Sequence, residues 1–177
     1  MVTGSAVGYT PPMPYTPILA TLGYIFSEDR TRVLMVHRTA RGPADPHHGK
    51  FNGLGGKVER DEDVFAGLCR ELREEAGIVV TSAELAGTVS WPGFGQHGED
   101  WFGFVFRVFA FTGIPPVANE DGPLEWVEVS RVLNLPLWEG DRFFLPLVFD
   151  FAARPFHGVM PYLNRKPTGW RYSSAGV

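Results

Sequence analysis

Runs of apolar and β-branched residues, separated by short polar breaks, predict most of the strands in this chain. Residues 18–26 and 32–38 are two such runs around the polar turn 27–31, and this spacing predicts a β-hairpin. The same criterion predicts four further strands, at residues 79–91, 101–111, 124–129 and 156–162.

Two other segments have the 3.6-residue periodicity of amphipathic helices. In the first, the apolar positions form one stripe, made of Val64, Phe65, Leu68, Cys69, Leu72 and Ala76. Acidic residues at 61–63 favour a helix start there, and Gly77 is typical of a left-handed cap at the end. The second helix is expected over residues 140–153, with Pro146 bending or restarting it. Strands that alternate unevenly with two helices predict an α/β (α+β) fold, a mixed β-sheet sandwiched between helices.

The length and composition favour one domain of ordinary size. The chain has 177 residues, 44% of them hydrophobic, which is enough to bury a sizeable core. Residues 1–17 carry four prolines and are expected to form a flexible arm. The domain is expected over residues 18–165, and a polar tail over 166–177.

Charge and cysteine content limit the classes of partner. The net charge of −4 offers no broad basic surface, so duplex nucleic acid is not an expected partner. The chain has no run of 18 apolar residues and no secretory signal pattern, so we expect no membrane association and a cytoplasmic protein. Cys69 is the single cysteine, which excludes an intrachain disulfide. The oligomeric state is left open.

The first predicted helix carries three carboxylates, Glu71, Glu74 and Glu75, within one stretch of five residues. Their spacing places them on one arc about 100° wide. Such a cluster is either a solvated acidic face or a site where a hard divalent cation offsets the repulsion. Glu75 falls at the edge of the apolar stripe, so we expect it to be the least solvated and to need a partner such as a metal or Arg70.

The segment before this helix is rich in glycine and histidine. Gly53, Gly55 and Gly56 allow the backbone to bend tightly and to approach a ligand closely. His47 and His48 lie on the loop 39–50, where adjacent histidines without a second ligand pair are expected to be solvent-exposed rather than metal-bound.

Nine positions together resemble a known signature, the Nudix box of the Nudix (MutT-type) hydrolases. The matching residues are Gly56, Glu62, Arg70, Glu71, Leu72, Glu74, Glu75, Gly77 and Ile78. The resemblance implies the Nudix fold and hydrolysis of a nucleoside diphosphate linked to another group, with Mg²⁺ as cofactor and Mn²⁺ as the alternative.

In that family the metal is held by the residues that correspond to the carbonyl of Gly56 and to Glu71, Glu74 and Glu75. Arg70 would orient the glutamates and Glu62 would balance Arg70. For the general base, Glu75 is the first candidate and Glu99, beside the strand that starts at Trp101, is the second.

The segments 51–58 and 137–146 resemble those of mammalian-type 8-oxo-dGTP diphosphatases and their bacterial relatives. The resemblance implies that Asn52 hydrogen-bonds the base, that Trp138 stacks on it, and that Asp141 accepts from guanine. The remaining expected substrate contacts are Thr21, Arg38 and Lys57. Where those enzymes have two neighbouring aspartates this chain has Gly140 and Asp141, and Phe51 replaces a tryptophan. A single aspartate cannot share a proton with a second one, so we expect a guanine preference over oxidised adenine.

The first functional hypothesis is therefore a Mg²⁺-dependent nucleoside triphosphate pyrophosphohydrolase that acts on 8-oxo-dGTP or related purine nucleotides, in nucleotide-pool sanitation linked to DNA repair. ADP-ribose is an alternative, since Pro92 lies where that subfamily often carries proline. Dinucleoside polyphosphates and the triphosphate end of RNA are further alternatives. A non-catalytic nucleotide sensor would be expected to lose box glutamates, which this chain keeps.

Overall fold

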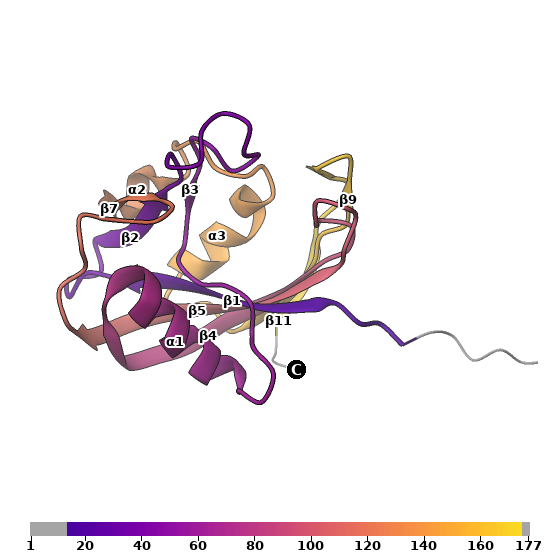
Figure 1. The fold of residues 1–177 in the computed structure, drawn as a ribbon. Coiled ribbons are helices and arrows are strands. Elements are labelled where there is room, and N and C mark those ends of the chain that lie inside the picture. The colour runs from indigo at the N-terminus through magenta and orange to yellow at the C-terminus, as the bar shows by residue number, and fades with distance from the viewer. Residues whose placement is uncertain (1–13, 175–177) are drawn as a thin grey trace, which may run out of the picture.

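The structure is a computed structural model that describes residues 14–174 (Figure 1). Its helices are α1 (Val64–Ala76), α2 (Val129–Val132) and α3 (Asp141–Phe149). Its strands are β1 (Ile18–Phe26), β2 (Arg32–His37), β3 (Phe51–Asn52), β4 (Val79–Trp91), β5 (Trp101–Thr112), β6 (Ala118–Asn119), β7 (Gly122–Glu128), β8 (Phe156–Val159), β9 (Tyr162–Leu163), β10 (Lys166–Pro167) and β11 (Arg171–Ser174).

Nine of these strands form one mixed sheet, in the order β11-β8-β4-β5-β1-β2-β7-β6 with β3 added to β2. The β1–β5 and β4–β8 pairs are parallel, whereas the other neighbours are antiparallel. Helix α1 covers one face of the sheet and α3 covers the other (Figure 1). Two separate hydrophobic clusters, one under each helix, follow from this arrangement. The predicted mixed sheet between helices is confirmed.

The ends of α1 are set by its sequence. The Asp63 side chain accepts hydrogen bonds from the backbone N–H groups of Phe65 and Ala66, as an N-cap does. Gly77 ends the helix with φ 64°, a left-handed conformation that glycine adopts without a steric penalty. Leu68, Leu72 and Ala76 of the predicted stripe are fully buried against the sheet. The face that carries the glutamates is thereby fixed relative to β1.

The glycine-rich segment after β3 lies along the first half of β1. Backbone hydrogen bonds join Thr21 N to Gly56 O (2.8 Å), Gly23 N to Leu54 O (2.6 Å) and Val58 N to Leu19 O (3.0 Å). At Gly55, φ is +141° and an added Cβ would lie 2.3 Å from the carbonyl oxygen of Thr21. Only glycine fits there, and its backbone is what brings the segment against the strand.

The sequence-based boundaries differ from the structure mainly near the C-terminus. The β1–β2 hairpin is confirmed, but the strand expected at 156–162 is divided into β8 and β9. The expected polar tail contains β10 and β11, and β11 pairs with β8, because the chain turns back at residues 160–170. Residues 175–177 of that tail lie outside the described residues.

The other differences are smaller. Helix α3 runs from Asp141 to Phe149 with Pro146 inside it, rather than over residues 140–153. The short elements β3, β6 and α2 were not predicted, since segments of two to four residues carry no measurable periodicity. Of the expected arm, residues 14–17 are described and contain neither helix nor strand. Among residues 14–174, no helix is long and apolar enough to cross a membrane.

Candidate functional site

Arg70 is the centre of a network of charged groups on α1. Its guanidinium binds both carboxylate oxygens of Glu62, at 2.8 and 3.2 Å, and donates to Glu71 at 2.9 Å and to Glu74 at 3.3 Å. It also donates to the carbonyl of Lys57 at 2.9 Å. Bonds to these carboxylates raise the pKa of Arg70 and lower the pKa of Glu62. Arg70 therefore orients two of the three predicted ligands and fixes the helix to the glycine segment.

The carboxylate of Glu71 lies directly against the backbone of Gly56. A Cβ added to Gly56 would lie 2.5 Å from one oxygen of Glu71 and 2.6 Å from the other. The carbonyl oxygen of Gly56 accepts from the Thr21 N–H, which leaves one of its two lone pairs free. A side chain at position 56 would push Glu71 away from this carbonyl.

Glu75 lies closer to the sheet than Glu74 does. Its carboxylate accepts from the N–H of Gly55 at 2.8 Å, and burial raises its pKa to about 7. Glu74 has a side chain that is 59% exposed, whereas Glu71 and Glu75 are both half-buried. Glu75 is less exposed than Glu74, as expected, and Glu71 is half-buried too. The hydrogen-bond partner of Glu75 is the N–H of Gly55 rather than Arg70.

The donors on this face suit a hard divalent cation. All of them are oxygen atoms, from three carboxylates and one backbone carbonyl, as Mg²⁺ requires. Within the described residues, no three acidic, histidine or cysteine side chains stand close enough to hold an ion as they are. Because Mg²⁺ is usually bound through one or two carboxylates together with water and substrate phosphates, a complete protein cage is not needed. The residues present therefore fit the ion.

A cavity of about 150 Å³ begins at Gly55 and Gly56 and extends between the sheet and the loop before α3. We name it the inner cavity. Its walls include four of the six predicted substrate contacts, namely Thr21, Asn52, Trp138 and Asp141. These residues come from β1, β3, the α2–α3 segment and the start of α3, so the fold brings them together from distant parts of the sequence.

Several polar groups of the inner cavity lack partners among the described residues. Thr21 is only 3% exposed, yet its Oγ1 makes no hydrogen bond, and neither does Oδ1 of Asn52 or Nε1 of Trp101. Burial raises the pKa of Asp141 to about 7. Because buried polar atoms normally have hydrogen-bond partners, these atoms mark a site that a polar ligand completes.

Trp138 is held from two sides. The ammonium of Lys50 lies 4.8 Å from its ring centroid, and its indole N–H donates to Nδ1 of His47 at 3.2 Å. The exposed position expected for His47 is wrong, because its ring is half-buried and lines the inner cavity, whereas His48 is exposed. Trp138 thus has a hydrogen-bond acceptor at its edge and a cation near its ring.

Gly140 differs from the acidic residue of the mammalian-type pattern for a steric reason. An added Cβ at Gly140 would lie 2.1 Å from the hydroxyl oxygen of Tyr162 and 2.5 Å from the sulfur of Met160. Tyr162 lines the inner cavity, and burial together with the Asp141 charge raises its pKa. The tyrosine hydroxyl thus occupies the space that a second aspartate would need.

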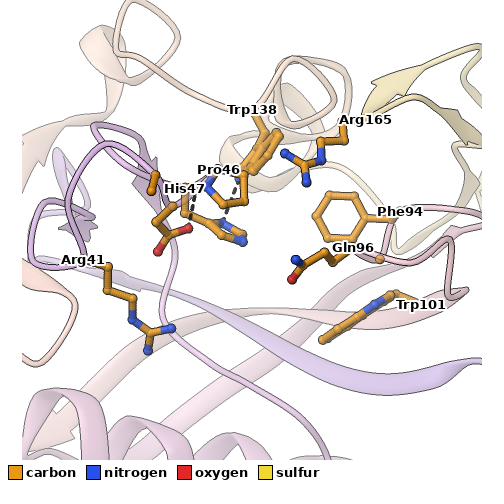
Figure 2. Close-up of a pocket in the computed structure, with 11 residues that line it drawn as sticks. Arg41, Pro46, His47, Phe94, Gln96, Trp101, Trp138 and Arg165 are labelled. Atoms are coloured by element: carbon orange, nitrogen blue, oxygen red, sulfur yellow. Dashed lines mark hydrogen bonds between the residues drawn. The ribbon is translucent and has the colours of Figure 1, made fainter.

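A second, larger cavity of about 480 Å³ adjoins the first (Figure 2). We name it the outer cavity. It shares His47, Phe94, Trp101 and Trp138 with the inner cavity, and adds Arg41 and Arg165 on different sides. Positive charge on its walls suits an anionic ligand.

Of the remaining predicted residues, Arg38 and Lys57 flank this region. Arg38 pairs with the buried Asp121 at 3.0 Å, as Arg41 does at 3.2 Å, and Lys57 lies 5.6 Å from the ring centroid of Trp101. Glu99 is exposed, and hydrogen bonds from its own backbone N–H and from the N–H of His97 lower its pKa. The structure thus provides no contact between Glu99 and the glutamates of α1.

The comparisons with known proteins agree with this geometry. Residues 16–148 match the model of the NUDIX domain family. The chain belongs to the Nudix family. It is 30% identical over 102 residues to an oxidized purine nucleoside triphosphate hydrolase of Danio rerio, which covers 58% of this chain and 64% of that protein. It is 31% identical over 133 residues to a CTP pyrophosphohydrolase of Escherichia coli, covering 70% and 87%.

Among solved structures, the MutT protein of Bacillus halodurans is similar with a TM-score of 0.75 and 26% identity, over 88% of this chain and 97% of that one. The predicted recognition as a MutT-type Nudix hydrolase, and hence as an enzyme, is confirmed.

Several residues of the site were not found from the sequence, among them Phe94, Asp121, Tyr162 and Arg165. Tyr162 ends the predicted strand 156–162 and Arg165 is the last residue of the predicted domain, but no local pattern marks either as part of a site. Phe94 and Asp121 lie in loops without a recognisable pattern. Aromatic residues among glycines, as at Phe94, were the one available indication.

Proposed function

We propose that this Nudix hydrolase is a Mg²⁺-dependent nucleoside triphosphate pyrophosphohydrolase that converts 8-oxo-dGTP or related guanine nucleotides to the monophosphate and pyrophosphate. The observation that carries the proposal is the inner cavity, whose walls include Asn52, Trp138 and Asp141. Gly56 also lines this cavity, and the carboxylate of Glu71 lies against its backbone. Asn52 offers an amide, and Asp141 offers an acceptor for the N1–H and amino group of guanine. Trp138 offers a face for stacking.

Gly56, Glu71, Glu74 and Glu75 would hold the divalent cation. When bound, the cation neutralises phosphate oxygens and lowers the pKa of a bound water. Arg70 keeps Glu71 and Glu74 in place through its hydrogen bonds. Glu75 takes a proton from the attacking water, whose oxygen forms the new bond to phosphorus as the phosphoanhydride bond breaks. Arg38 and Lys57 attract the polyphosphate chain, which the overall charge of −4 would otherwise repel.

The proposal is tested by pyrophosphate release from a nucleotide panel with and without MgCl₂. The panel contains dGTP, 8-oxo-dGTP, oxidised dATP, CTP, ADP-ribose and triphosphorylated RNA. We expect the highest kcat/KM with the guanine nucleotides and loss of turnover with a chelator. Faster hydrolysis of CTP would favour a pyrimidine enzyme like the Escherichia coli relative, and comparable values for oxidised dATP would contradict the guanine preference.

Substitution of the glutamates tests the assignment of roles. Glu74→Gln and Glu75→Gln should each lower kcat by about 10² or more, because a metal ligand or a general base is lost while the volume is kept. Glu28→Gln is the control, since Glu28 is exposed in the β1–β2 turn. Circular dichroism confirms folding. A folded variant with unchanged turnover contradicts the role of that glutamate.

A further inference from the structure

Tyr162 brings a hydroxyl group to the end of the inner cavity where α3 begins. Its side chain is 8% exposed and lines that cavity together with Asp141. The hydroxyl oxygen lies against the backbone of Gly140, since a Cβ built on that glycine would be 2.1 Å away from it. Gly140 directly precedes Asp141 in the chain. The hydroxyl of Tyr162 and the carboxylate of Asp141 therefore lie at the same end of the cavity.

This hydroxyl has no hydrogen-bond partner within residues 14–174. The backbone N–H of Tyr162 donates to the carbonyl oxygen of Pro92 at 2.7 Å, whereas the side-chain oxygen makes no bond there. Unlike Oγ1 of Thr21, the oxygen is not fully enclosed. Burial and the charges of Asp141 and Glu139 raise the pKa of Tyr162, so the phenol keeps its hydrogen at neutral pH. It is thus a donor that a ligand can use.

The position of the Tyr162 ring is set by its surroundings. The ring of Phe94 meets it edge-on, at 74° and with 5.0 Å between the centroids. Phe94 also meets Trp138 edge-on, with 5.9 Å between those centroids. The backbone of Tyr162 is bound to the same loop through Pro92. Because ring and backbone are both held, the hydroxyl needs little ordering when a ligand binds.

The two groups at this end of the cavity differ in what they offer to a base. An ionised carboxylate at Asp141 offers acceptors only, whereas the hydroxyl of Tyr162 can also donate. The edge of guanine carries an amino group, the N1–H group and the carbonyl oxygen O6 in that order, which makes two donors followed by one acceptor. A protein that binds this whole edge needs a donor beside its carboxylate.

We propose that Tyr162 is a specificity-determining residue whose hydroxyl donates to O6 of a guanine base while Asp141 accepts from N1–H and the amino group. The inference rests on the proposed function, in which Asp141 takes the N1–H edge and Trp138 takes the face of the base. An adenine lacks both the N1 hydrogen and O6, so it would lose both contacts. The contact thus favours guanine over adenine nucleotides.

Base analogues that change one group of the edge separate this contact from a structural role. In 6-thio-dGTP the N1–H and amino groups are kept, but a sulfur atom, which is a weak acceptor, replaces O6. In dITP the N1–H and O6 are kept and the amino group is absent. Tyr162→Phe removes the hydroxyl and keeps a ring against Phe94. Tyr172→Phe is the matched control, because Tyr172 is 49% exposed on β11.

We expect the wild-type kcat/KM to be about fivefold lower for 6-thio-dGTP than for dGTP, the size of one hydrogen bond. Tyr162→Phe should lose about fivefold on dGTP and on dITP, and about twofold at most on 6-thio-dGTP. Tyr172→Phe should equal the wild type with all three nucleotides. Circular dichroism confirms folding.

Two results overturn the contact. An equal loss by Tyr162→Phe on all three nucleotides would mean that the tyrosine only shapes the cavity or orients Asp141. A folded Tyr162→Phe variant with the wild-type kcat/KM for dGTP would mean that the hydroxyl does not contact the base.

The failure of the proposed function has a different appearance. A protein that hydrolyses no triphosphate in the panel contradicts the proposed reaction, and the Tyr162 contact is then decided by calorimetric binding of dGMP and 6-thio-dGMP. Tighter binding of dGMP by the wild type, lost in Tyr162→Phe, supports the contact. Equal wild-type affinities, or no binding of either nucleotide, overturn it.

Discussion

Asp141 is a carboxylic acid whose surroundings disfavour its charge. Burial raises its pKa to about 7, and the nearby Lys50 and Arg142 offset only part of this effect. A protonated carboxyl has a hydroxyl where the carboxylate has an acceptor, so it cannot accept two hydrogen bonds from the guanine edge in the same way. The protonation state of one side chain should therefore control base recognition near neutral pH.

We predict that the affinity for dGMP falls as the pH is lowered from 8 to 6. The sign follows from the raised pKa, because Asp141 is mainly ionised above about 7 and mainly protonated below it. Calorimetric titrations at several pH values, without metal, measure the effect. Asp141→Asn should bind dGMP weakly at every pH. A wild-type affinity that is constant over this range contradicts the proposed role of Asp141.

Position 140 requires glycine because of the side chain of Tyr162, which packs against it, and not because of its backbone conformation. Its φ of −65° suits any residue, but an added Cβ would collide with the tyrosine hydroxyl. We predict that Gly140→Ala displaces Tyr162 and raises the KM for dGTP by about tenfold. Gly140→Ala combined with Tyr162→Phe should recover part of the loss, since the colliding oxygen is then absent. Steady-state kinetics on the two variants and on Tyr162→Phe alone provide the test, and identical KM values for Gly140→Ala and wild type contradict it.

At the scale of elements, helix α1 is the support for the charged network. Asp63 caps its N-terminus, its first turn carries no acidic residue, and Gly77 caps its C-terminus. We predict that Asp63→Ala lowers the free energy of unfolding by about 1 kcal/mol, the usual cost of a lost cap, with a matching fall in the melting temperature. Turnover at 25 °C should change little, because Asp63 does not contact the cavities.

The control for this substitution is Asp63→Asn, since asparagine caps helices as well as aspartate does. Thermal denaturation followed by circular dichroism measures both variants. Equal destabilisation by Ala and Asn would mean that the charge, rather than the cap, is what stabilises the start of α1.

Helix α3 is held at its far end by a buried charge. Arg107 of β5 is 2% exposed and donates to the carbonyl oxygens of Leu147, Val148 and Asp150, at 2.7 to 2.8 Å, and to Glu84 at 2.7 Å. Leu147 and Val148 belong to the last helical turn, whose carbonyls lack partners within the helix, and Asp150 follows the end of the helix. Because Asp141 is at the other end of the same helix, Arg107 helps to set the position of the base-recognition residue from outside the site.

The elements that the sequence predicted are those with local causes. The stripe of α1, its caps and the alternating runs of β1, β2, β4 and β5 are all determined within a few residues. The nine-residue box likewise predicted the Arg70 network. The contacts of His47 with Trp138 and of Gly140 with Tyr162 join residues 91 and 22 positions apart, and no local pattern encodes them. Non-local packing is thus what the sequence left undetermined.

At the scale of the whole molecule, the charge is unevenly distributed. The chain carries a net charge of −4, yet basic side chains from separate segments line the outer cavity or flank it: Arg38, Arg41, Lys50, Lys57 and Arg165. A local field of this kind attracts a polyphosphate while the remaining surface does not favour duplex nucleic acid. The distribution agrees with a small anionic substrate.

The sheet continues beyond the part of the chain that matches the family model. That match ends at residue 148, whereas β8 and β11 extend the sheet and the β9–β10 hairpin supplies Tyr162 and Arg165 to the cavities. Asn164 and Arg165 have positive φ values of 51° and 64°, which are uncommon for residues other than glycine. Positive φ at both residues of this two-residue loop is the geometry of a type I′ turn, the usual connection in a tight β-hairpin.

We predict that a chain ending at Met160 has a lower melting temperature and a KM for dGTP raised about tenfold or more, because it lacks both a sheet edge and a wall of the inner cavity. The full-length variant Tyr162→Ala removes that wall alone and keeps β11. It should raise KM by a similar factor and reduce the melting temperature less. If the truncated chain lost stability while Tyr162→Ala kept the wild-type KM, the C-terminal segment would serve the sheet and not the nucleotide site. Comparing the two variants by kinetics and thermal denaturation thus separates the contribution of the segment to the fold from its contribution to the site.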